Sequence, residues 1–278
     1  MLRSILLALD DTPGAHAARD AAIALAGRTG AALTCAVVLD RPHTLDSSEP
    51  VPVGGAAFAE RRNAAVAAQV EAEGRAALAA AREAAGALPI EALTLEEAPE
   101  PALLRAGAAH DLIVLGRDST LGREETEDGL APVVEELLRD GARPLLVVPP
   151  AGAAQDGPVL VGYDGSLPAM RSLQLFALLG LAEGSPVRLL AAHEALEAAA
   201  RLAAEGAAYL RRHGLAVEEW AVAGGRAAEL LLAEAATLRA RLLVMGAFGS
   251  PTGLRAFLLG STTRRLLREA PCAVFVHH

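Results

Sequence analysis

Residues 157–180 read GPVLVGYDGSLPAMRSLQLFALLG, and residues 3–27 read RSILLALDDTPGAHAARDAAIALAG. Each segment is an apolar run that ends in an aspartate and continues through a small polar turn into an apolar pattern with helical spacing. Asp164 in one segment therefore matches Asp10 in the other. Such a repeat predicts two copies of one strand–turn–helix unit, and it decides the architecture before any single motif does.

Two further pairs of segments extend the repeat over most of the chain. HDLIVLGRDSTLG (110–122) matches ARLLVMGAFGSPTG (240–253), and RPLLVVPP (143–150) matches APCAVFVHH (270–278). Continuous Val, Ile and Leu runs alternate with helical patterns, which is typical of parallel strands covered on both faces. We therefore predict an α/β fold with two tandem doubly wound, five-stranded parallel-sheet sandwiches, at residues 1–150 and 157–278, joined by a short linker.

The first half carries an insertion. The strand-terminal aspartate and the glycine that ends the fourth strand are 106 positions apart in the first half and 82 in the second. The first half is therefore 24 residues longer over this stretch, and we place the insertion at 41–63, ahead of a long Ala-rich helix expected at residues 64–85. Because the insertion begins with many Pro, Ser and Gly residues, we expect a loop, either a solvated excursion without chemistry or a lid.

The composition excludes several classes of chemistry. All 25 basic residues are arginine, so the chain lacks the lysine of P-loop NTPases, protein kinases and Schiff-base enzymes. The net charge of −9 disfavours binding to nucleic acid or to an anionic membrane. No apolar run approaches the ~20 residues of a membrane span, and Cys35 and Cys272 lie in runs typical of buried strands. We expect a cytoplasmic protein whose partners are small molecules or proteins.

The second half carries a candidate anion site where the fourth strand ends and the last helix begins. Its residues are Met245, Gly246, Gly249, Gly260, Ser261 and Thr262. Glycines let backbone amides approach an anion closely, and hydroxyl groups at a helix start add donors to the positive end of the helix dipole. In the alternative interpretation the glycines only turn the chain and Ser261 only caps the helix.

The expected topology brings a carboxylate to the same place. In an open parallel sheet, the ligand crevice lies beyond the carboxyl ends of the strands that flank the reversal of strand order. If the first and fourth strands are those neighbours, Asp164, Gly165 and Ser166 face the glycine-rich segment. The Asp164 carboxylate, which could bind a ribose hydroxyl or a metal, would then lie opposite backbone amides that could bind phosphates. The two segments together predict a nucleotide site.

With these segments the chain resembles a tandem universal stress protein, in which two domains of the family are fused. The resemblance covers nearly all 278 residues and implies an adenine nucleotide alpha hydrolase-like fold. Nucleotide-binding members carry a strand-terminal aspartate and a Gly-x2-Gly-x9-Gly-(Ser/Thr) signature, which Asp164, Gly246, Gly249 and Gly260-Ser261 match here. The resemblance implies ATP as the ligand, with Mg²⁺ as a candidate companion, and backbone near Ala192 meeting the adenine.

The resemblance also implies that the two halves pack about a pseudo-twofold axis, with the closing strands at residues 145–148 and 273–276 side by side. The residues support this arrangement, because an uncovered closing strand would be an apolar edge, which folded proteins avoid. A further homodimer is left open.

The two halves depart from the signature to different degrees. In the second half, ten residues (250–259) separate Gly249 from Gly260, where the family signature has nine. In the first half, Ser119 replaces the second glycine and Ala131-Pro132 replaces the Gly-Ser pair, so an amide donor is lost. The same loop carries four carboxylates between residues 124 and 128, which would repel a triphosphate. We predict that the first half does not bind ATP and serves as a built-in dimer partner.

Other candidate residues have simpler explanations. His193 could line the mouth of the crevice or be a solvated residue at a strand end. Arg264, Arg265 and Arg268 could reach a phosphate or lie on a helix surface. The pair His277-His278 has no partner at metal-ligand spacing, so we predict no metal site there.

Three functions remain open at this point. The first is a stress-response module that binds ATP in its second half and is non-catalytic or at most a slow ATPase. The others are a nucleotide-free structural protein of the same fold and a hydrolase acting on an adenylate. The retained glycines favour the first over the second, and the lack of an acid–base group beyond Asp164 favours it over the third.

Overall fold

The computed structural model describes residues 1–40, 56–122, 129–154, 156–182, 184–248 and 260–278. Gly249 and residues 41–55 of the predicted insertion therefore lie outside the described residues. The first half consists of β1 (Ser4–Leu9), α1 (Pro13–Thr29), β2 (Ala32–Val38), α3 (Ala56–Ala85), β3 (Ile90–Leu95), α4 (Pro99–Gly107), β4 (Leu112–Gly116), α5 (Pro132–Asp140) and β5 (Leu145–Val148). The second half consists of β6 (Val159–Gly162), α6 (Leu167–Leu179), β7 (Val187–His193), α7 (Leu196–Arg212), β8 (Val217–Ala223), α8 (Ala227–Leu238), β9 (Leu242–Gly246), α9 (Ser261–Glu269) and β10 (Ala273–His277).

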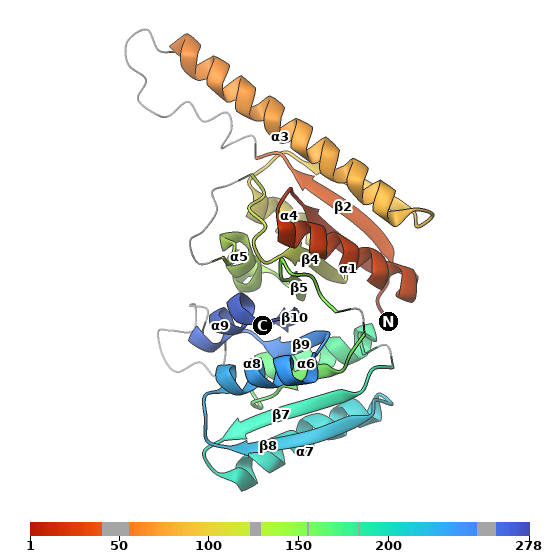
Figure 1. Ribbon diagram of the computed structural model, residues 1–278, viewed down its shortest axis with the longest axis vertical. Coiled ribbons are helices and arrows are strands. Elements are labelled where there is room, and N and C mark those ends of the chain that lie inside the picture. The colour runs from red at the N-terminus through yellow and green to blue at the C-terminus, as the bar shows by residue number, and fades with distance from the viewer. Residues whose placement is uncertain (41–55, 123–128, 155, 183, 249–259) are drawn as a thin grey trace.

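The ten strands form one sheet in the order β3-β2-β1-β4-β5-β10-β9-β6-β7-β8 (Figure 1). All pairs within each half are parallel, as the apolar runs predict. The halves meet at β5 and β10, which pair antiparallel with Val147 opposite Val274. The closing strands therefore lie side by side, as expected, and the antiparallel pair lies at the centre of a pseudo-twofold arrangement.

Helices cover both faces of this sheet and enclose two apolar cores. One core joins residues of α1, α3, α6 and α7 to the sheet, and the other joins residues of α4, α5, α8 and α9. Phe176 of α6 and Phe275 of β10 are fully buried in the first core, with ring centroids 6.5 Å apart. Cys35 and Cys272 are buried and free, as predicted. No helix in the described part of the chain is long and apolar enough to cross a membrane.

The first helix of each half begins and ends in the same way. The Thr12 hydroxyl accepts the Ala15 amide at the start of α1, and the Ser166 hydroxyl accepts the Ala169 amide at the start of α6. Each helix ends at a glycine in the left-handed conformation, Gly30 or Gly180. These caps fix where α1 and α6 begin, and therefore where the aspartates before them lie.

The expectation for the insertion is corrected at its end. Residues 56–63, placed in a loop by the sequence, belong to α3, which begins at Ala56 instead of residue 64. The physical reason is local, because AAFAERRNAA contains neither Gly nor Pro and is rich in alanine, the best helix former. Figure 1 shows the N-terminal part of α3 extending beyond the body of the molecule.

Candidate functional site

A crevice opens in the second half at the carboxyl ends of β6 and β9. These strands are parallel neighbours, with Val161 opposite Val244, as the predicted reversal of strand order requires. The cavity measures about 260 Å³, close to the lower limit of ~300 Å³ for ligand pockets. Seven of the residues predicted for a site line it: Asp164, Ala192, Met245, Gly246, Gly260, Ser261 and Thr262.

Two other predicted residues shape the crevice without lining it. Gly165 has φ +73°, a conformation that favours glycine, and it turns the chain between β6 and α6. Ser166 donates its amide to Asp164 Oδ1 at 3.0 Å, and its hydroxyl caps α6. The turn therefore orients the exposed Asp164 carboxylate at the edge of the crevice.

Gly246 has a packing role that the sequence did not reveal. A Cβ atom at this position would lie 2.5 Å from the Ala169 amide nitrogen and 2.6 Å from the Pro168 carbonyl carbon. The end of β9 therefore passes against the first turn of α6 at a distance that only glycine allows. Gly116 in the first half has the same role, because its Cβ would lie 2.4 Å from the Ala15 nitrogen.

Gly260 differs from Gly246 in its surroundings. It is the N-cap of α9, with φ −60°, and among the described residues the nearest atom to a Cβ built there is Thr263 Oγ1 at 3.9 Å. Glycine has no side chain to cap the helix, so no side chain of the N-cap residue accepts a hydrogen bond from the first-turn amides of α9. The exposed Ser261 and Thr262 line the crevice beside these amides. The prediction that these three residues open the last helix is confirmed.

The equivalent aspartate of the first half is engaged by its own chain. Asp10 accepts hydrogen bonds from the Thr12 amide at 3.0 Å, the Thr12 hydroxyl at 2.7 Å and the Leu121 amide at 2.8 Å. Leu121 is 2% exposed and packs into the core beneath the loop after β4. Burial raises the pKa of Asp10 above its ordinary value, and the nearby Asp118 carboxylate adds to this, while the hydrogen bonds oppose it.

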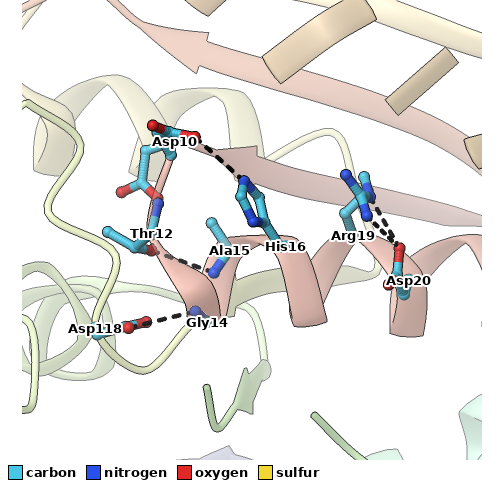
Figure 2. Close-up of polar contacts among 9 residues, drawn as sticks. Asp10, Thr12, Gly14, Ala15, His16, Arg19, Asp20 and Asp118 are labelled. Carbon is cyan, nitrogen blue, oxygen red and sulfur yellow. Dashed lines mark hydrogen bonds and ion pairs between the residues drawn. The ribbon is translucent and has the colours of Figure 1, made fainter. Parts of the chain in front are cut away.

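The loop after β4 forms further bonds inside the first half. The Gly14 amide, in the first turn of α1, donates to Asp118 at 3.3 Å (Figure 2). The fully buried Ser119 hydroxyl accepts the Gly116 amide at 3.1 Å, and the Ala131 amide donates to the Arg117 carbonyl at 2.8 Å. In the first half, the carboxylate that corresponds to Asp164 and the backbone amides at the corresponding positions are thus already hydrogen-bonded to other groups of the same half.

Comparison with known proteins decides the family. The model of the universal stress protein family matches residues 1–149 and again residues 157–278. The chain belongs to the universal stress protein family. No curated protein matches it in sequence.

Solved structures of similar length share the tandem fold. A universal stress protein from Archaeoglobus fulgidus DSM 4304 is 17% identical, with 99% of this chain and 95% of that chain covered and a TM-score of 0.69. A functionally unknown protein from Pseudomonas aeruginosa PAO1 is 20% identical, with 99% and 92% covered and a TM-score of 0.58. At these identities the likeness establishes the fold, two universal stress protein domains in one chain.

Within this fold, part of the crevice wall was not predicted from the sequence. The apolar wall includes Tyr163 at the end of β6, Leu190 of β7, and Ala227 and Leu231 of α8. Burial raises the pKa of the Tyr163 hydroxyl, with smaller contributions from the charges of Glu205 and Asp164. Ala227 follows β8 at the same edge of the sheet. The rule that ligands bind beyond the carboxyl ends of parallel strands, which placed Asp164 at the crevice, could therefore also have indicated the start of α8.

The weaker candidates have partners or positions away from the crevice. His193 is exposed at the end of β7, where its Nδ1 accepts the Ala195 amide at 3.1 Å. Arg264 forms an ion pair with Glu135 at 2.8 Å, and Arg265 pairs with Glu229 and Glu269 at 3.2 Å each. Among the described residues, no group of three or more His, Cys, Asp or Glu side chains could hold a metal ion.

Proposed function

We propose that this universal stress protein binds ATP in the crevice of its second half and acts as a nucleotide-binding module in a stress response. The observation that carries the proposal is the convergence of two separate segments on one cavity. Asp164, at the end of the first strand of the half, and the first turn of α9, 96 or more positions later, face the same crevice. A carboxylate opposite a helix N-terminus is the pairing that a ribose and its phosphates need.

The residues present fit the parts of such a ligand. The carboxylate of Asp164 is exposed and accepts hydrogen bonds, which suits the hydroxyl groups of a ribose. The amides of the first turn of α9, with the Ser261 and Thr262 hydroxyls, would hold phosphates without lysine. Leu190, Leu231 and the neighbouring aliphatic side chains form an apolar wall that suits a base. Mg²⁺, if bound with ATP, would offset part of the phosphate charge.

Binding fits this site better than rapid hydrolysis. Among the described residues that line the crevice, Asp164 is the one carboxylate, and no histidine or lysine accompanies it. In this proposal Asp164 meets the ribose, whereas the first turn of α9 meets the phosphates. General acid–base catalysis needs a group within hydrogen-bond reach of the reacting atoms. We therefore propose a module that retains ATP and hydrolyses it slowly at most.

We propose that the first half binds no nucleotide. Leu121 donates to the Asp10 carboxylate, and Pro132, the first residue of α5, has no amide hydrogen to offer a phosphate. The Ala131 amide before it already donates to Arg117. In this proposal the role of the first half is structural, because its strand β5 covers the edge of β10.

Calorimetric titration of the nucleotide-free protein with ATP and Mg²⁺ tests the proposal. Asp164→Ala removes the acceptor, and we expect it to weaken binding about 10-fold or more, the usual effect of losing hydrogen bonds to a charged group. Gly260→Pro removes one amide donor, and the φ of −60° at this position is one that proline adopts. We expect this variant to weaken ATP binding as well. Unmodified protein without saturable binding would refute the proposal and leave the nucleotide-free structural function.

A further inference from the structure

Helix α9, which opens the proposed phosphate site, is held by residues of the other half of the chain. Near its start, Arg264 pairs with Glu135 of α5 at 2.8 Å. At its end, Arg117 Nη1 donates to the Ala270 carbonyl at 3.1 Å and to the Leu267 carbonyl at 3.5 Å. Figure 1 shows α5 and α9 next to each other where the two halves meet. Contacts from the first half thus hold both ends of the helix.

Arg117 is itself fixed by the backbone of the first half. Its amide donates to the Val148 carbonyl at the end of β5, at 2.8 Å, and its carbonyl accepts the Ala131 amide before α5, also at 2.8 Å. The next residue, Asp118, bonds the first turn of α1. The guanidinium therefore extends from a well-anchored backbone position and not from a free loop.

The contact from Arg117 to α9 has no counterpart at the equivalent position of the second half. Ala247 occupies the position equivalent to Arg117, because each residue follows the glycine that ends the fourth strand of its half. The Ala247 amide donates to the His277 carbonyl at 2.8 Å, as the Arg117 amide does to Val148. The methyl side chain of Ala247 cannot donate a hydrogen bond, so the second half has no matching contact from this position to α5.

Helix α9 depends on outside contacts because of its length and its position. It has nine residues, and helices shorter than ~12 residues are marginal without tertiary packing. Its buried residues are Thr263, Leu266 and Leu267, while Ser261 and Thr262 at its start are exposed. A cation at the end of a helix satisfies carbonyls that have no intrahelical partner and complements the helix dipole.

We infer that Arg117 is a positioning residue for the nucleotide site of the second half. By holding the last turn of α9, Arg117 fixes the orientation of the helix. It thereby fixes the place of the Ser261 and Thr262 hydrogen-bond donors at the other end of the helix, and these donors would bind phosphates. Binding groups lose affinity when their supporting contacts leave them about 1 Å too loose. The inference rests on the proposed ATP site, and it gives the first half a part in binding beyond covering the edge of β10.

The test compares Arg117→Ala with a matched variant, Arg143→Ala, in the full-length protein. Arg143 also donates to a carbonyl at a helix end, that of Ala108 after α4, at 2.7 Å, but this contact stays within the first half. Affinities for ATP and for adenosine are measured on the same samples by calorimetry. Adenosine lacks the phosphates, so it reports the crevice without the contribution of the phosphate donors at the start of α9.

We expect Arg117→Ala to weaken ATP binding about fivefold, within the range found for residues that couple distant sites, and to leave adenosine binding within twofold of the unmodified protein. Arg143→Ala should change neither affinity. An unchanged ATP affinity in Arg117→Ala overturns the inference. An equal loss of ATP and adenosine affinity overturns it too, because a general structural defect would produce that result.

Hydrogen exchange in the nucleotide-free protein separates this inference from the proposed function. The Arg264 amide donates to the Gly260 carbonyl at 2.9 Å in the first turn of α9. If Arg117 positions the helix, this amide exchanges faster in Arg117→Ala than in the unmodified protein or in Arg143→Ala. Equal rates in all three proteins overturn the inference. If the unmodified protein binds neither ligand, the proposed function fails, and the exchange rates alone decide whether Arg117 positions α9.

Discussion

Asp10 and Asp164 occupy the same position of the repeated unit, yet their carboxylates have different partners. Asp10 accepts three hydrogen bonds, one of them from Leu121, which lies 111 residues away in the sequence. Asp164 is exposed and accepts the neighbouring Ser166 amide. The same residue type therefore stabilises the fold in one half and remains accessible to a ligand in the other.

An alanine substitution should lower mainly the stability of the protein at position 10 and mainly its ATP affinity at position 164. Asp10→Ala leaves three partly buried donors without this acceptor, and we expect it to lower the free energy of unfolding by about 1.5–3 kcal/mol while ATP binding is retained. Asp164→Ala should cost less than about 1 kcal/mol in stability, because its side chain is exposed, but should weaken ATP binding. Urea denaturation and calorimetry on both variants provide the comparison. Equal losses of stability would show that the two aspartates have the same role.

The sequence could identify Asp164 but not how the two aspartates differ. The match between Asp10 and Asp164 follows from local pattern, whereas the bond from Leu121 depends on the path of the loop after β4. Ser119, Ala131 and Pro132 indicated that the first half had lost donors. Nothing in that segment indicated that its own backbone would bond Asp10. Such a contact arises only when residues far apart in the sequence pack together.

At the scale of elements, the strands could be predicted from the sequence, but the residue at which α3 begins could not. Runs buried on both faces of a parallel sheet have a strong sequence signal. The start of α3 at Ala56 was missed, because the Pro- and Gly-rich residues before it suggested a loop that continued further. Likewise, Leu231 contributes to the crevice only because α8 packs over β6, which periodicity alone does not reveal.

The glycines at the end of β9 and at the start of α9 should differ in their tolerance of a methyl group. Gly246→Ala places a Cβ within 2.5 Å of the Ala169 nitrogen, and we expect a loss of about 1–3 kcal/mol in stability from this overpacking. Among the described residues, a Cβ at Gly260 makes only an ordinary contact, 3.9 Å from Thr263 Oγ1, and φ is ordinary there, so Gly260→Ala should cost less than about 1 kcal/mol. Urea denaturation of both variants measures the difference. Similar losses would contradict the packing role given to Gly246.

At the scale of the whole molecule, the two halves share one sheet. The pairing of β5 with β10 continues the sheet across the pseudo-twofold axis, and Arg117 and Arg264 add side-chain contacts on the face covered by α5 and α9. The repeat in the sequence predicted the pairing of the closing strands. It did not predict these arginine contacts, because they join positions at which the two halves differ.

This continuity predicts that the halves unfold together. Trp220, the single tryptophan of the chain, lies in β8 and reports on the second half, whereas far-ultraviolet circular dichroism reports on both halves. We expect the urea transitions seen by fluorescence and by circular dichroism to coincide, as they do for a two-state protein. ATP at 100 times its Kd should stabilise the chain by about 2.7 kcal/mol. Two separate transitions would show that the halves are independent.

The stoichiometry of ATP binding tests the central claim most directly. Nucleotide-free protein titrated with ATP and Mg²⁺ in a calorimeter should bind one ATP per chain, in the second half, and Asp10→Ala should leave that number unchanged. No saturable binding would contradict the proposed ATP site, and two ATP per chain would contradict the claim that the first half binds none.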